Sequence, residues 1–185
     1  GLVGEEISLR CASHDLHSGS FGGAALNPLH VLTKVLGSLH DDQGRVTVPG
    51  FYDGVADISP ELRTNWENLG FDSAAFLGGA GLTTPAGEVG RTVLEKIWSR
   101  PTCEINGLAG GYAGPGFKTV LPATAEAKVS FRLVAGQDPQ KIRSAFRQFV
   151  KDRLPPDAKI EFREHGGSPA VHLAIDGEAM SKARA

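Results

Sequence analysis

Three segments of this chain alternate apolar and polar residues with a period of two. Residues 125–134, which read Ala-Glu-Ala-Lys-Val-Ser-Phe-Arg-Leu-Val, show the alternation most clearly, and residues 6–13 and 158–163 share it. A period of two places successive side chains on opposite faces of a strand, so each segment predicts a strand with one buried face. Residues 102–106 are also strand-like. Burial on one side only is typical of an antiparallel sheet covered on a single face.

Two segments between these strands carry apolar residues at helical spacing. Residues 24–39 include Asn27-Pro28 near their start, where proline costs a helix no hydrogen bond. Residues 139–154 follow Asp138 and end before a pair of prolines. The order strand, helix, strand, strand, helix, strand predicts an α+β fold of the ferredoxin-like kind (βαββαβ). In this two-layer sandwich, two helices lie on one face of a four-stranded antiparallel sheet.

Residues 46–100 differ in character from the rest of the chain. They begin with an extended, turn-rich stretch, after which Ser59-Pro60 favours a helix start through an N-cap and a first-turn proline. Thr84-Pro85 favours another helix start, running to about Trp98. We therefore expect residues 46–100 to form a helical insertion.

The insertion and the core strands predict a single domain that belongs to a longer protein. The last residues show a weak pattern, and residues 178–185 resemble the start of a helix. The expected organisation is a core of residues 1–45 and 101–166, the insertion at 46–100, and a final segment at 167–185 that leads out of this core.

The composition argues against several classes of partner. The chain has 185 residues, 41% hydrophobic and 22% charged, which is usual for a globular protein. Its formal net charge is -2 with both signs interspersed, which argues against nucleic-acid binding, and no apolar run could span a membrane. We expect Cys11 and Cys103 to be buried thiols, and this sparse use of cysteine fits a reducing, cytoplasmic location. Glu5-Glu6 near the N-terminus is expected to be solvated.

The glycine-flanked segment around His17 is the leading candidate for a functional site. Its glycines would let a ligand or a neighbouring backbone approach closely. Three interpretations are open: His14 and His17 bind a metal ion, His17 is a surface residue without a role, or His17 contacts a substrate. Zinc needs at least three protein ligands, and no third ligand lies nearby in the sequence, so we expect no metal site in this chain.

A second candidate segment, residues 110–119, is rich in glycine but does not meet the requirements of a phosphate-binding loop. Phe117 stands where that loop needs a glycine directly before Lys-Thr, and Pro115 removes a backbone N–H group. The segment is either a flexible connection or a support that places the Thr119 hydroxyl at the mouth of a site. Arg132 is either a solvated or paired strand residue, or a planar fork for a substrate carboxylate.

Three strings in this sequence occur in an informative order. They are His17-Ser18-Gly19 followed by a helical segment, the string GPGFKTVLP at 114–122, and the string SFRLV at 130–134. In this order they closely resemble the dimerisation (lid) domain of the M20 family of zinc metallopeptidases. The insertion makes the chain most similar to the carnosine-dipeptidase-like branch, and the resemblance covers almost the whole chain.

The resemblance implies a division of labour between domains. Family members join this lid to a catalytic domain that holds two zinc ions, and the ligand strings of that domain are absent here, so the lid alone would be inactive. The resemblance implies that His17 reaches across a homodimer into the partner's active site and polarises the scissile carbonyl. It also implies that Thr119 contacts a peptide or dipeptide substrate and that Arg132 binds the terminal carboxylate of that substrate.

Two other functions are open at this point. One is a self-standing ferredoxin-like module that binds a small ligand or a partner protein, and the other is the lid of an M20-like aminoacylase or amidohydrolase. In each peptidase-like case we expect a homodimer to form through an edge of the sheet, since an edge strand can extend a sheet into a second copy. The strand at 102–106 is the candidate edge.

Overall fold

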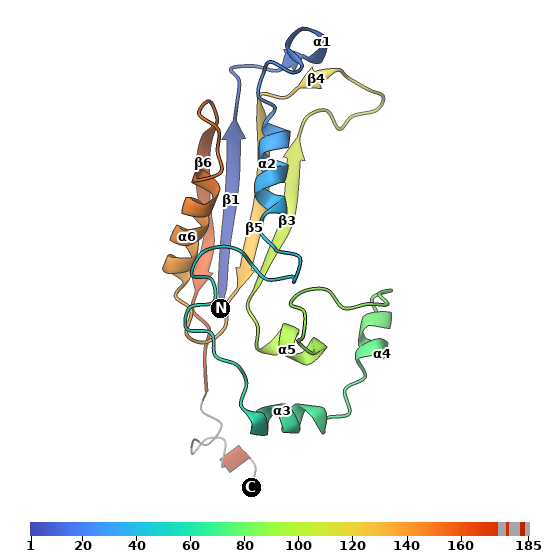
Figure 1. The fold of residues 1–185 in the computed structure, drawn as a ribbon, viewed down its shortest axis with the longest axis vertical. Helices are drawn as coiled ribbons and strands as arrows, with labels where there is room; N and C mark the ends of the chain where they lie inside the picture. The colour runs from blue at the N-terminus through green and yellow to red at the C-terminus, as the bar shows by residue number, and fades with distance from the viewer. Residues whose placement is uncertain (174–176, 178–181, 184–185) are drawn as a thin grey trace.

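Four long strands form one antiparallel sheet in the computed structural model of this chain, which describes residues 1–173, 177 and 182–183. Their order across the sheet is β3-β5-β1-β6, so β1 and β5 are central and the other two are edges (Figure 1). The expected α+β, ferredoxin-like arrangement is therefore confirmed. The strands are β1 (Leu2–Arg10), β3 (Thr102–Gly110), β5 (Thr124–Arg132) and β6 (Lys159–Ser168).

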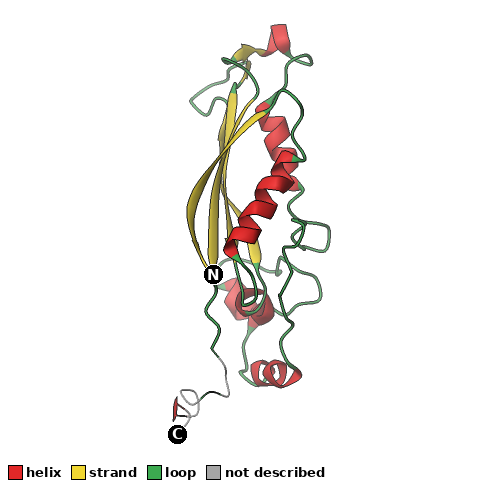
Figure 2. Cartoon of the chain, turned by 90° about the vertical axis from the view of Figure 1, so that its left-hand side faces the viewer, coloured by secondary structure: helices red, strands yellow, loops and turns green. Residues whose placement is uncertain are grey.

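Two helices, α2 (Pro28–Gly37) and α6 (Pro139–Lys151), cover one face of the sheet and leave the other face open (Figure 2). Each begins where the sequence predicts a start. The side chains of Asn27 and Asp138 accept backbone N–H groups of the first helical turn, and a proline follows each of them. These caps satisfy donors that have no partner within a helix, which is why both helices begin at these residues.

The core lies between the sheet and these two helices. Buried and exposed residues alternate along β1 and β5, as the period of two predicts. The ring of Phe131 on β5 lies 5.1 Å from the ring of Phe146 on α6 and 5.9 Å from the ring of Phe51. All three rings are fully buried, and aromatic side chains of this size contribute much of the free energy gained by removing apolar surface from water.

One buried position in the core is charged. The carboxylate of Glu5 on β1 points toward α6, where it accepts hydrogen bonds from Arg143 Nε at 2.7 Å and from Arg147 Nε at 2.9 Å. Arg143 also donates to the carbonyl oxygen of Gly166. The expectation that Glu5 is solvated is wrong, because its register places it on the helix-covered face of β1. Its neighbour Glu6 lies on the opposite face and pairs with His165.

Both edge strands are longer than the sequence predicts. We expected the strand that begins at Thr102 to end at residue 106, but β3 continues through Gly107 to Gly110, and β6 continues through Gly166 and Gly167. Glycine weakens a strand because ordering its flexible backbone costs conformational entropy and because it has no side chain that could pack. Pairing with the central strands β5 and β1 outweighs that cost here, with a shift in register inside β3.

The segment from residue 46 to residue 100 carries three short helices away from the main sheet (Figure 1). The predicted start at Ser59 is confirmed, since its hydroxyl caps the first of them. The predicted start at Thr84 is wrong: the last helix begins after Thr92, whose hydroxyl and backbone exchange hydrogen bonds with Glu95. The helices are α3 (Pro60–Glu67), α4 (Ser73–Gly78) and α5 (Val93–Trp98).

The expected helix at 178–185 lies largely outside the described residues. Within the described part, no helix combines the length and the apolar character needed to cross a membrane.

Candidate functional site

A small second sheet lies beyond the end of the main sheet where β5 begins (Figure 1). It pairs β2 (Leu16–His17) with β4 (Val120–Leu121), and the helical turn α1 (Ser18–Phe21) follows directly. The segment around His17, which we expected to be a loop, is therefore a short strand followed by a turn of helix. This pairing sets the position of the candidate site.

The pairing brings together two of the three site residues predicted from the sequence. Nε2 of His17 lies 3.2 Å from Oγ1 of Thr119, although the two residues are 102 positions apart. The backbone N–H of Ser18 also donates to the carbonyl oxygen of Thr119 at 2.9 Å. Both side chains are exposed, so their polar atoms remain accessible to a ligand.

The hydrogen bonds of the His17 ring fix its tautomer. The backbone N–H of Gly19 donates to Nδ1 at 3.0 Å, so Nδ1 acts as an acceptor and carries no proton. A neutral imidazole has one N–H group, and that proton must then lie on Nε2. His17 therefore presents an N–H donor at the atom that faces Thr119, and the Thr119 hydroxyl can accept this hydrogen bond while donating its own proton outward.

Gly19 is required by the close approach of the His17 ring. A Cβ atom added at residue 19 would lie 2.8 Å from Cε1 and 3.0 Å from Nδ1 of His17. Real Cβ atoms are not found at such distances, so any larger residue would displace the ring. Because Gly19 has no side chain, it leaves room for the His17 ring in this orientation. From the sequence, the glycines near His17 were expected only to let a ligand or a neighbouring backbone approach closely.

Two further contacts tie this end of the molecule to the main sheet. Asp15 Oδ1 accepts the backbone N–H of Ala123 at 2.8 Å, and the N–H of Cys11 donates to the carbonyl oxygen of Ala123 at 2.9 Å. Ala123 lies directly before β5. The strand that carries His17 and the strand that follows Thr119 are therefore both held against the same end of the core.

The pair lies at an open hollow of about 450 Å³. The β3–β4 connection forms one side of it and contributes Phe117, a residue that sequence reasoning noticed only as a mismatch to the phosphate-binding loop. The β2 strand forms the other side. The lining residues are Asp15, Leu16, His17, Phe117, Lys118, Thr119 and Val120.

Arg132, the third predicted site residue, lies at the opposite end of the sheet. It ends β5, with Leu2 of β1 and Thr102 of β3 as its neighbours on the flanking strands. The eight steps of β5 between Thr124 and Arg132 correspond to roughly 26 Å at about 3.3 Å per residue. Its guanidinium is exposed on the open face and has no hydrogen bond or ion pair to any residue that the structure describes.

The described residues do not assemble a metal site. Within residues 1–173, 177 and 182–183, no three histidine, cysteine or acidic side chains converge to hold an ion. His14 does not join His17, because its Nδ1 lies 2.9 Å from Ser13 Oγ. A zinc ion of the kind that the resemblance implies does not fit the donors at this site.

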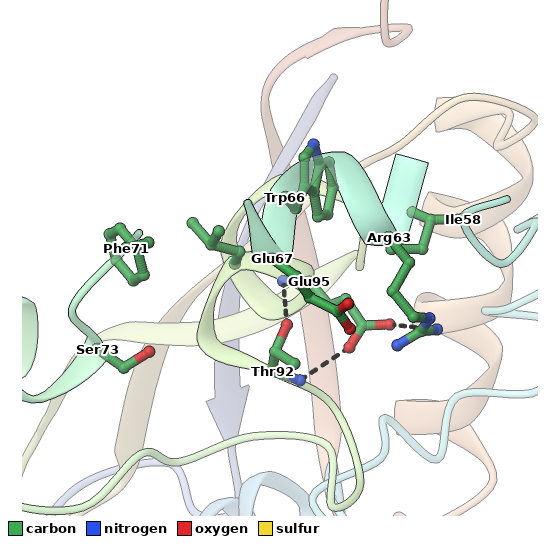
Figure 3. Close-up of a pocket in the computed structure, with 9 residues that line it drawn as sticks. Ile58, Arg63, Trp66, Glu67, Phe71, Ser73, Thr92 and Glu95 are labelled. Carbon is green, nitrogen blue, oxygen red and sulfur yellow. Dashed lines mark hydrogen bonds and ion pairs between the residues drawn. The ribbon is translucent and has the colours of Figure 1, made fainter. Parts of the chain in front are cut away.

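A smaller hollow of about 150 Å³ lies between α3 and α5 (Figure 3). Apolar side chains such as Trp66 line it, and one wall carries the carboxylate of Glu95. Burial alone would raise the pKa of Glu95, but hydrogen bonds from Thr92 and the ion pair with Arg63 at 2.9 Å lower it. The Glu95 carboxylate is thus fully engaged in structural contacts.

The two thiols differ in environment. Cys103 is buried, as expected, and burial raises the pKa of its thiol to about 12, with the nearby charge of Glu104 adding to the shift. Cys11 is only partly buried, so the expectation of full burial is wrong for this residue. Both are free cysteines, and neither lines the hollow at the His17–Thr119 pair.

Fold and site together define a class of domain: a ferredoxin-like unit that presents an exposed histidine–threonine pair at one end and an exposed arginine at the other. A family model described as the peptidase dimerisation domain matches residues 1–158. The chain belongs to this M20 dimerisation domain family.

Relatives and solved structures of this family include dipeptidases. The chain is 32% identical to the Beta-Ala-His dipeptidase of Rattus norvegicus over 78% of its own length and 30% of the relative's. It is 33% identical to the Cys-Gly metallodipeptidase DUG1 of Saccharomyces cerevisiae over 89% of its own length and 33% of the relative's. The chain therefore spans about a third of the length of these relatives.

Solved structures support the same assignment. An M20 family metallo-carboxypeptidase from Sulfolobus solfataricus superposes with a TM-score of 0.84 at 30% identity, over 98% of this chain and 40% of that one. Human carnosine dipeptidase 1 superposes with a TM-score of 0.79 at 26% identity, over 90% of this chain and 36% of that one. These findings support the reading as a peptidase lid over that of a self-standing interaction module.

Proposed function

We propose that this chain is the lid and dimerisation domain of a metallodipeptidase, and that it contributes substrate-contacting groups to active sites completed by a catalytic domain outside this sequence. The observation that carries the proposal is the His17–Thr119 contact at 3.2 Å. It presents two exposed polar groups at the surface with no catalytic cluster beside them among the described residues. Similarity to dipeptidases three times as long supports the same conclusion.

The chemistry of the pair suits a carbonyl substrate. When a peptide bond is attacked, negative charge develops on the carbonyl oxygen, and donors aimed at that oxygen stabilise the transition state. His17 has its donor on Nε2 because Gly19 occupies Nδ1. Thr119 lies within hydrogen-bond distance of that donor and can hold the ring or bind a neighbouring polar group of the substrate.

Arg132 suits recognition of a carboxylate, since its planar guanidinium is exposed and unpaired among the described residues. It is, however, too far from His17 to act on the same molecule. An extended dipeptide spans about 7 Å, against the roughly 26 Å along β5 alone. We therefore propose that one chain serves two active sites: Arg132 acts in one of them, and His17 with Thr119 acts in the other.

A symmetric homodimer provides two such sites. In a twofold dimer each site can receive His17 from one subunit and Arg132 from the other. The strand β3 is an edge of the sheet, as expected, and it carries the half-exposed apolar side chains Ile105 and Leu108. We propose that the dimer forms along this edge, because an unpaired strand edge with exposed apolar groups is suited to pairing with a second copy.

The remaining assignments concern the organisation of this chain and the catalytic domain outside it. We propose that residues 46–100 are an insertion in a core of residues 1–45 and 101–166, that residues 167–185 lead back to the catalytic domain, and that this domain holds two zinc ions. The description of the DUG1 relative as a metallodipeptidase supports the metal. A cytoplasmic location is consistent with two free cysteines.

The experiment that tests the proposal replaces His17 in the complete enzyme. His17→Ala should lower dipeptide turnover about 100-fold or more, as loss of an oxyanion donor does elsewhere. Metal content, measured by atomic emission, should stay at the wild-type level because no metal ligand is removed. His14→Ala is the matched control, and it should retain turnover because the His14 ring hydrogen-bonds to its neighbour Ser13 and does not line the hollow that holds His17 and Thr119. Normal turnover in the His17 variant would contradict the proposal.

A further inference from the structure

The most exposed large apolar side chain at the His17 end of the molecule belongs to Phe117. Its side chain is 88% exposed, whereas the other phenylalanine at this end, Phe21 of α1, is 46% exposed. Folding of this domain gives no reason for a phenylalanine in that position, because it packs against almost nothing. Phe117 lines the hollow that also holds His17 and Thr119, so its exposed ring is available to a molecule bound there.

Contacts among the residues of the β3–β4 connection hold the segment around Phe117 in place. Tyr112 donates a hydrogen bond from its hydroxyl to the carbonyl oxygen of Pro115 at 2.6 Å. The ammonium group of Lys118 lies 4.5 Å from the centre of the Tyr112 ring, a cation–π contact. Gly116 has a φ of +80°, which allows the sharp turn just before Phe117. Contacts on both sides of Phe117 therefore fix the backbone there, and the Phe117 ring projects into solvent.

Phe117 lines the same hollow as His17 and Thr119. A substrate whose carbonyl oxygen meets the Nε2 donor of His17 would place its adjacent side chain within this hollow. The polar atoms of His17 and Thr119 would orient the peptide group, and Phe117 has the largest aromatic ring among the described residues that line the hollow. Aromatic walls of this kind are the usual means by which sites recognise apolar groups.

We propose that Phe117 is a specificity-determining residue that contacts the side chain of the substrate and favours dipeptides with a bulky apolar residue over those with glycine. The inference rests on the proposed function, because it requires that His17 meets the scissile carbonyl. It adds a substrate class to that function: dipeptides that contain leucine or a residue of similar size and polarity.

The test measures kcat/KM of the complete enzyme for four dipeptides: Ala-Leu, Leu-Ala, Ala-Gly and Gly-Ala. Phe117→Ala should lower kcat/KM for at least one leucine dipeptide about tenfold or more, as loss of apolar contact in a binding pocket does. The glycine-containing dipeptides should change little. Phe117→Leu should recover most of the lost selectivity, because it restores apolar surface. Phe21→Ala is the matched control and should leave all four values near wild type.

Two outcomes would overturn the inference while leaving the proposed function intact. An equal loss for all four dipeptides would mean that Phe117 contacts protein when the lid closes, and unchanged values would mean that it contacts nothing in the complex. A wild-type enzyme that hydrolyses none of the four dipeptides would overturn the inference alone, whereas one that hydrolyses no dipeptide at all, Beta-Ala-His and Cys-Gly included, would also overturn the proposed function.

Discussion

At the scale of single residues, the site depends on how one imidazole ring is held. Sequence reasoning identifies His17 and Thr119 separately, from a glycine-flanked histidine and a recurrent string of residues. It does not reveal that they touch, because their contact is made by a two-residue strand pairing that no periodicity marks. Nor does it reveal the tautomer, which depends on one backbone N–H group, that of Gly19. Residue types can be read from sequence, but proton positions require the local backbone.

Replacement of Gly19 tests whether the ring orientation matters. Gly19→Ala places a methyl group 2.8 Å from Cε1 of His17, so the ring must move. We expect turnover of the complete enzyme to fall at least about tenfold, since displacement of a catalytic group by 1 Å can cost about 100-fold. Circular dichroism should show an intact fold. Gly37→Ala is the control: that helical glycine has open space around its Cβ position, and the change should leave turnover unchanged.

The thiol of Cys103 predicts a loss of stability at alkaline pH. Its folded pKa of about 12 lies above the ordinary value of 9, so the folded state keeps a proton that the unfolded state releases. The unfolded state therefore binds fewer protons between pH 9 and pH 12, and stability falls as pH rises through this window. Denaturant midpoints of wild type and Cys103→Ala should converge from pH 8 to pH 10.5. A constant difference between them would contradict the assigned pKa.

At the scale of elements, the sequence predicts the four strands and two core helices because an element buried on one face needs apolar residues at the repeat of a strand or a helix. The wrong predictions also have physical causes. The helix expected from Thr84 starts instead after Thr92, where the reciprocal hydrogen bonds with Glu95 give a stronger cap than a proline alone. The edge strands extend past their glycines because neighbouring strands supply hydrogen-bond partners. These hydrogen bonds depend on the tertiary fold, so the local sequence pattern does not predict how far each edge strand extends.

The buried Glu5 offers a test of how β1 and α6 are joined. Glu5→Ala removes the fully buried carboxylate that Arg143 and Arg147 share, and breaking a buried ion pair from one side costs about 3–5 kcal/mol of unfolding free energy. Chemical denaturation of the isolated domain measures this loss directly. Glu6→Ala, one residue along and on the open face, should leave the denaturation midpoint near wild type. Similar effects of both changes would mean that strand register, rather than the ion pair, sets the cost.

At the scale of the whole molecule, the sheet separates the two ends to which we propose functions. His17 with Thr119 lies beyond one end of β5, and Arg132 closes the other, roughly 26 Å away along the strand. From the sequence, the resemblance gives all three residues a role toward one substrate and places only His17 across the dimer, without the distance between His17 and Arg132. The fold separates them, and a dimer with an active site shared between subunits reconciles the separation with a single small substrate.

Mixed dimers test this central claim most directly. Subunits with His17→Ala and subunits with Arg132→Ala are coexpressed with different tags, and the mixed dimer is purified by sequential affinity steps. One active site of that dimer then has both residues intact, and the other lacks both. The account predicts about half of the wild-type dipeptide turnover for the mixed dimer, with little turnover in either mutant homodimer. A mixed dimer no more active than the two homodimers would contradict it.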